Sequence, residues 1–111
     1  MPFIRTSELP PKEPLPGFVG RFFHSEHMTF VHYEIAPGAR VHPHRHENEE
    51  AWHVVEGELE MTLDGATTVL RAGDAAVVPA NVEHCAGAAG RCRAIVVDYP
   101  VREAVGGVGT R

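Results

Sequence analysis

Four residues that can bind a metal ion stand out by type and spacing: His44, His46, Glu50 and His84. His44 and His46 are separated by one residue, so on an extended strand both imidazoles project from the same face. Glu50 follows a short polar turn, and His84 comes from a distant segment. Three imidazoles and one carboxylate suit a divalent transition metal such as Fe, Mn, Ni or Zn. We predict that these four residues form one metal site.

The ligand number of this site indicates what it could do. Four protein ligands on a metal that prefers six leave about two positions for water or a substrate oxygen. Because His84 and Glu50 come from other segments than the histidine pair, the four side chains converge only if a sheet closes around them. The alternative is a histidine cluster on a solvated turn without a metal, and the combined spacing favours the metal site.

Other residues near the motif have less specific signals. His53 has the opposite strand parity to Glu50, so we expect it to face away from the metal. His42 shares the parity of His44 and is either a ligand or neighbour of the metal, or a solvated residue where a strand begins. Trp52 and Phe30 are candidates for an apolar cavity wall, although each residue taken alone favours ordinary core packing.

The run from Gly38 to Gly57 resembles the first motif of the cupin family, G-x5-H-x-H-x3-E-x6-G, at every fixed position. The segment from Gly73 to His84 resembles the second motif, with Asn81 in place of a glycine and, beyond it, Ala88 in place of an asparagine. Asn tolerates left-handed backbone geometry, so Asn81 is a mild departure. The resemblance implies an all-β single domain, a small double-stranded β-helix or jelly-roll barrel, with the four residues above as metal ligands.

Two flanking segments, HSEHMTFVHYEIAPGARVHPHRH and CRAIVVDYPVRE, resemble the small pectin-degradation cupins that linearise 4,5-unsaturated monouronates. That family has Gln where this chain has Glu50, and its tail reads Asp-x-Phe-x-Pro-x-Arg-Glu. Arg102 matches the arginine, which implies a role in binding a substrate carboxylate. The aspartate position is Val96, and the phenylalanine position is Asp98. We therefore name Arg102 as a catalytic candidate and Asp98 as a second one, for proton transfer.

Composition limits the classes of partner. The chain has 111 residues and a net charge of −5, which offers no attraction to nucleic acid or to an anionic membrane. No apolar run approaches the ~20 residues of a membrane-spanning helix. With two cysteines and no export signal, we predict a reduced, cytoplasmic protein; a Cys85–Cys92 disulfide is possible but not favoured.

Eleven glycines and nine prolines favour short strands and tight turns over helices. We predict an extended arm over residues 1–16, a barrel over 17–100 and a tail over 101–111. The expected strands are Phe18–His24, His27–Ile35, Ala51–Val55, Glu58–Asp64, Thr67–Arg71, Ala75–Val78, Glu83–Ala86 and Arg93–Tyr99. Because an open sandwich exposes sheet edges, we also predict a homodimer in which the arm and Phe18–Phe23 are exchanged as covers.

Three functions are compatible with these residues. The first is a metal-dependent isomerase or lyase acting on a polar small molecule such as a sugar acid. The second is an Fe(II) dioxygenase, since a histidine and carboxylate site with open positions also supports O₂ chemistry. The third is a cupin that binds a small ligand without catalysis. The fold alone does not choose among them.

Overall fold

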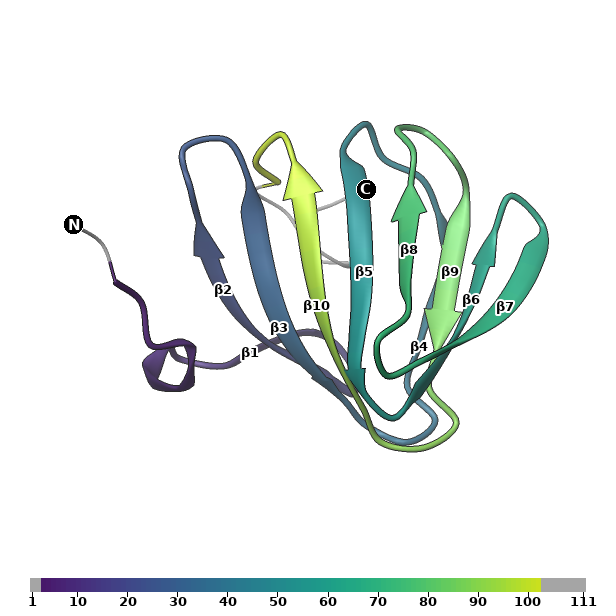
Figure 1. Ribbon diagram of the computed structural model, residues 1–111, viewed down its shortest axis with the longest axis horizontal. Helices are drawn as coiled ribbons and strands as arrows, with labels where there is room; N and C mark the ends of the chain where they lie inside the picture. The colour runs from purple at the N-terminus through teal and green to yellow at the C-terminus, as the bar shows by residue number, and fades with distance from the viewer. Residues whose placement is uncertain (1–2, 103–111) are drawn as a thin grey trace.

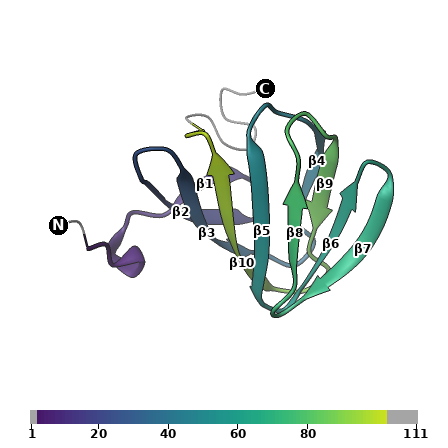
Figure 2. The same ribbon diagram turned by 45° about the horizontal axis from the view of Figure 1, so that its top comes forward.

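The computed structural model describes residues 3–102, which form two antiparallel sheets that meet at one end and separate toward the other (Figures 1 and 2). The six-stranded sheet has the order β1-β2-β3-β10-β5-β8, and the four-stranded sheet has the order β4-β9-β6-β7. The strands are β1 Lys12–Leu15, β2 Phe18–His24, β3 Thr29–Ile35, β4 Arg40–His44, β5 Glu49–Glu56, β6 Glu58–Leu63, β7 Ala66–Arg71, β8 Ala75–Val78, β9 His84–Gly87 and β10 Cys92–Tyr99. This is the predicted all-β jelly roll.

Local sequence explains the β6–β7 hairpin. Leu59 and Met61 alternate with exposed residues and face the core, as a sheet with one wet face requires. Asp64 and Gly65 connect the strands, with φ values of 47° and 85°. These left-handed conformations are the ones that a two-residue turn needs, and an Asp-Gly pair adopts them readily.

The apolar core lies between the two sheets. Rings from β2, β3 and β5 meet there: Phe18 packs edge-on against Tyr33 at 5.7 Å, and Tyr33 stacks on Trp52 at 6.3 Å between ring centroids. Strand β10 sits between β3 and β5 and pairs with both along its length. Its central place in the sheet holds the residues at its end firmly in the barrel.

Two strands were not predicted, and both contain a proline. Pro14 lies in β1 and Pro43 in β4, and each of these strands is at the edge of its sheet. Proline cannot donate a ladder hydrogen bond, so it is confined to such edges. The predicted arm therefore contributes an edge strand, and the part before it, with the short 3₁₀ turn η1 over Thr6–Glu8, lies at the edge of the barrel and contacts β2 (Figure 1).

The predicted tail lies largely outside the described residues. Of residues 101–111 the structure describes Val101 and Arg102, and the Arg102 side chain is buried. Cys85 and Cys92 are both free thiols. Between residues 3 and 102, no helix has the length and apolar character needed to cross a membrane.

Candidate metal centre

The three predicted imidazole ligands converge inside the barrel. His44 ends β4 and pairs across the sheet with His84, the first residue of β9, and their ring centroids are 4.2 Å apart. His46, two residues after His44, brings its ring centroid to 4.9 Å from that of His84. One nitrogen from each of the three rings lies within 4.8 Å of the others. The sequence motif therefore folds into a compact histidine cluster.

Backbone carbonyls fix the orientation of all three rings. Each imidazole places Nδ1 against the carbonyl of a residue two positions away; the distances are 2.8 Å from His44 to His42, 3.1 Å from His46 to Asn48 and 2.9 Å from His84 to Val82. A carbonyl only accepts, so Nδ1 carries the hydrogen and a neutral ring has its lone pair on Nε2. This arrangement is the usual support of a metal-binding histidine.

Glu50 lies beside two of these imidazoles. Its Oε1 is 3.2 Å from His84 Nε2, and its Oε2 is 3.6 Å from His46 Nε2. Both Nε2 atoms are buried and have no hydrogen-bond partner. Lone pairs on such neighbouring nitrogen and oxygen atoms repel each other unless they share a cation. The buried donor set therefore fits a divalent metal ion.

Two donors hold the Glu50 carboxylate from its other side. Trp52 Nε1 donates to Oε1 at 2.7 Å, and Arg102 Nη1 donates to Oε2 at 2.9 Å. Burial acts to raise the pKa of Glu50, but neighbouring polar side chains, the Trp52 indole among them, outweigh it and hold this pKa well below its usual value. Glu50 is therefore a carboxylate in the folded protein.

The two catalytic candidates, Arg102 and Asp98, are next to this carboxylate. Arg102 is 4% exposed, and its Nη1 is 3.7 Å from Asp98 Oδ2, whose residue is fully buried. Asp98 forms a second group of close ligand atoms with His46 and Glu50, within 4.8 Å. The structure thus brings together all six residues that the sequence singled out, with two carboxyl groups around one guanidinium.

Two residues that sequence reasoning missed hold Arg102 in place. The Thr29 hydroxyl accepts a hydrogen bond from the Arg102 backbone N–H at 2.8 Å. The Asn48 side-chain amide donates to the carbonyl of Pro100 at 2.6 Å. Both contacts join segments more than 50 residues apart in sequence, so no local sequence pattern predicts them.

The space left beside these residues is small, about 30 Å³. Its lining consists of Leu15, Phe18, Tyr33, Val41, His44, Glu50, Trp52, Val96, Asp98 and Arg102. Trp52, one of the two candidates, is part of this wall and also packs in the apolar core. Phe30 is not, because it lies on the opposite face of the sheet and stacks on Phe23 at 4.8 Å. Burial, with a contribution from Glu50, raises the pKa of the Tyr33 hydroxyl in this wall.

The histidines around the cluster separate into two environments. Burial lowers the pKa of His44 to about 4, although its contact with the His42 carbonyl opposes the shift. The His42 side chain itself is exposed, and its carbonyl is what orients His44. His53 is exposed on the outer face, as its parity predicted.

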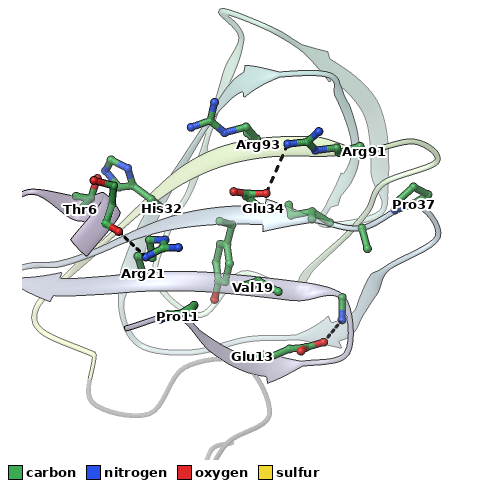
Figure 3. Close-up of a pocket in the computed structure, with 15 residues that line it drawn as sticks. Thr6, Pro11, Glu13, Val19, Arg21, His32, Glu34, Pro37, Arg91 and Arg93 are labelled. Carbon is green, nitrogen blue, oxygen red and sulfur yellow. Dashed lines mark hydrogen bonds and ion pairs between the residues drawn. The ribbon is translucent and has the colours of Figure 1, made fainter. Parts of the chain in front are cut away.

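A larger cleft, of about 700 Å³, lies elsewhere, between the arm and the outer face of the six-stranded sheet (Figure 3). Arg21, His32, Glu34 and Arg93 point into it from the strands. Arg21 also donates to the carbonyl of Ser7 at 3.0 Å and so ties the arm to the sheet. The cleft contains none of the clustered metal-binding groups, so we assign the chemistry to the small inner cavity.

Comparison with known proteins identifies a family and finds similar solved structures. The cupin domain family, Cupin_2, matches residues 31–98. KdgF from Halomonas sp. superposes with a TM-score of 0.87 at 28% identity, over 93% of this chain and 96% of that one. An RmlC-like cupin from Shewanella frigidimarina superposes with a TM-score of 0.86 at 27% identity, over 91% and 92%.

A curated relative is more similar over a shorter stretch. The polyketide synthase CurC of Streptomyces cyaneus is 45% identical over 51 residues, which are 45% of this chain and 33% of that protein. The match thus spans about a third of the relative's length, and it identifies a shared domain rather than a shared activity.

Proposed function

The chain belongs to the cupin family, and from this premise we propose that it is a divalent-metal enzyme acting on a polar small molecule such as a sugar acid. The likeness to KdgF, a pectin-degradation cupin, supports the sugar-acid class. We propose His44, His46, Glu50 and His84 as the ligands. A divalent ion bound there would supply Lewis acidity toward a substrate oxygen.

One observation carries this proposal: three imidazoles have their Nδ1 atoms fixed on backbone carbonyls, and one nitrogen from each lies within 4.8 Å of the others. A structural core would gain nothing from burying His46 and His84 with Nε2 unsatisfied, because such atoms cost free energy. Coordination of a metal ion would satisfy both Nε2 atoms.

For the reaction itself we propose roles for Arg102 and Asp98. Both line the inner cavity, so a substrate carboxylate that entered it would meet the guanidinium of Arg102. The planar fork of arginine matches the two oxygens of a carboxylate. Asp98 is the candidate for moving a proton at the substrate, because its carboxyl is in the cavity wall.

The test of this function is turnover of a panel of sugar acids by protein loaded with one metal at a time, under anaerobic conditions. We expect conversion of an unsaturated uronate or a related acid without consumption of oxygen. Arg102→Lys should raise KM and leave the metal content unchanged, because lysine keeps the charge and loses the fork. Wild-type kinetics in this variant would remove Arg102 from substrate binding.

The same panel in air distinguishes the alternatives. Oxygen uptake that depends on Fe(II) and on a substrate would indicate a dioxygenase instead. Tight binding of a panel member without any turnover would indicate a cupin that only binds its ligand.

We also propose that the protein is a homodimer and that it works in the cytoplasm. The free thiols of Cys85 and Cys92 are compatible with a reducing compartment. The exposed apolar residues Phe3 and Ile4 of the arm favour association between copies. Sedimentation of the wild-type protein tests the dimer: a monomer at ~100 µM, where even weak complexes assemble, would contradict it.

A further inference from the structure

One oxygen of Glu50 lies between the histidine cluster and a buried positive charge. Its Oε2 is 3.6 Å from His46 Nε2 and 2.9 Å from Arg102 Nη1. The first distance places this oxygen among the proposed metal ligands. The second makes it the acceptor of a charge-assisted hydrogen bond from the guanidinium. The same atom therefore belongs both to the metal centre and to an ion pair.

The guanidinium lowers the attraction of Glu50 for another cation. Arg102 and Glu50 are both buried, so water and salt screen their charges little. Arginine keeps its proton at any physiological pH, and its unit charge balances that of the carboxylate. A divalent ion arriving beside His46 and His84 would meet an ion pair rather than a lone carboxylate, and the guanidinium would repel it.

Arg102 is not needed to orient Glu50. Trp52 Nε1 donates to the other carboxylate oxygen, Oε1, at 2.7 Å, and the Trp52 ring is fixed in the core by stacking on Tyr33. Outer partners that orient a ligand usually raise metal affinity by about 10–100-fold. Because Trp52 already gives this support, we expect the charge of Arg102 to dominate and to act in the opposite direction.

The backbone of Arg102 is held separately from its side chain. The Thr29 hydroxyl accepts a hydrogen bond from the Arg102 N–H at 2.8 Å. From this fixed point the side chain reaches Glu50, and its Nη1 is also 3.7 Å from Asp98 Oδ2. A guanidinium that turned away from Glu50 would therefore keep a second carboxyl group beside it, which limits the cost of the movement in a buried site.

The inner cavity is too small for a sugar acid while Arg102 rests on Glu50. Its volume of about 30 Å³ has room for one or two water molecules. The carboxylate of a substrate presents two oxygens to the guanidinium, as the Glu50 carboxylate can, so the two carboxylates compete for the same donors. Entry of the substrate and release of Glu50 by Arg102 are therefore one exchange.

We propose that Glu50 and Arg102 couple metal binding to substrate binding. Without substrate the guanidinium lowers the metal affinity; when a substrate carboxylate takes the guanidinium, Glu50 attracts the metal ion with its full charge. Coupling is reciprocal, so a bound metal raises the affinity for the substrate by the same factor. The coupling rests on the metal site and the sugar-acid class proposed above. It requires glutamate at position 50, since glutamine has no charge to share.

Two methionine substitutions test the competition without any substrate, by calorimetric titration with each of Fe, Mn, Ni and Zn. Arg102→Met removes the guanidinium and keeps a long side chain, and we expect metal affinity to rise about tenfold or more. Arg45→Met is the matched control. Arg45 is next to a proposed ligand in sequence, but its side chain is 63% exposed. We therefore expect it to change the metal affinity less than about twofold, because solvent screens its charge.

A second measurement uses the wild-type protein and needs no folded variant. The metal titration is repeated with an excess of galacturonate, a saturated uronate, and with galactose, the same ring without a carboxylate. We expect galacturonate to raise the metal affinity about tenfold and galactose to leave it unchanged. Arg102→Met should lose most of the effect of galacturonate.

Metal affinity that falls or stays the same in Arg102→Met would overturn the coupling and make the guanidinium a support of Glu50. If that variant does not fold, the wild-type comparison decides: equal effects of galacturonate and galactose, or no effect of either, would overturn the coupling. Turnover of the sugar-acid panel is measured separately, so turnover without coupling leaves the proposed function in place. A protein that binds none of the four metals would overturn both.

Discussion

The two faces of strand β10 have opposite characters. On the inner face, Val96 and Asp98 line the cavity, and Asp98 is fully buried beside Arg102. On the outer face, Ile95 and Val97 are partly exposed. Toward its end, β10 therefore buries one charged residue, Asp98, among apolar neighbours on the inner face and leaves apolar side chains partly exposed on the outer face. Period-2 alternation thus gives the two faces of a single strand different environments.

The inner face differs from the uronate-linearising pattern by two acids. Glu50 stands where that pattern has glutamine, and Asp98 stands where it has phenylalanine. Both carboxyl groups lie near the single guanidinium of Arg102, at 2.9 Å and 3.7 Å. Part of its positive charge is therefore balanced within the chain. We expect Arg102 to bind a substrate carboxylate more weakly than it would with glutamine and phenylalanine at positions 50 and 98.

The largest expected effect is the loss of metal affinity when one of the proposed ligands is replaced. His46→Ala removes one ligand, and we expect metal affinity to fall by more than about 100-fold, since loss of even an outer hydrogen-bond partner costs 10–100-fold. His53→Ala is the matched control on the outer face and should bind metal as the wild type does. The measurement is metal titration of both variants. Equal loss in the two would contradict the assignment of the faces.

A second prediction concerns the buried charges. Arg102→Met leaves Glu50 without its guanidinium, and we expect the metal-free protein to lose about 3 kcal/mol of unfolding free energy. Arg40→Met is the control, because its ion pair with Glu60 is exposed and should contribute less than about 1 kcal/mol. Chemical denaturation measures both changes.

The rescue variant makes this second test specific. Adding Glu50→Gln to Arg102→Met removes the unpaired carboxylate and should recover part of the lost stability. If the double variant is no more stable than Arg102→Met, the guanidinium acts through packing and not through the Glu50 charge.

Much of the site could be predicted from the sequence, because its ligands lie in two short motifs and are identified by their spacing within them. The lining of the cavity could not. Strand β3 carries apolar residues on both faces, so its sequence does not fix the parity of Phe30, and this candidate for the cavity wall is wrong. The position of Arg102 depends on Thr29 and Asn48, which join it only through tertiary contacts. Long-range pairing decides these features, and local patterns do not contain it.

The smallest expected effect is a pH dependence of the metal-free protein. His44 has a pKa of about 4 when folded and about 6.5 when unfolded, so above pH 6.5 it contributes no pH dependence. As pH falls from 6.5 toward 4, the unfolded state takes up a proton that the folded state does not, and stability decreases. Denaturation between pH 7 and pH 5 should show this slope, and His44→Gln should reduce it. An unchanged slope in His44→Gln would assign the proton uptake to another group.

Metal titration of the wild-type protein, stripped with a chelator and offered Fe, Mn, Ni and Zn separately, tests the metal centre most directly. The three fixed imidazoles and the buried Glu50 predict one ion per chain, bound by at least one of these metals and released on acidification as the imidazoles take up protons. A protein that binds none of the four at one ion per chain would contradict the metal centre and the function proposed from it.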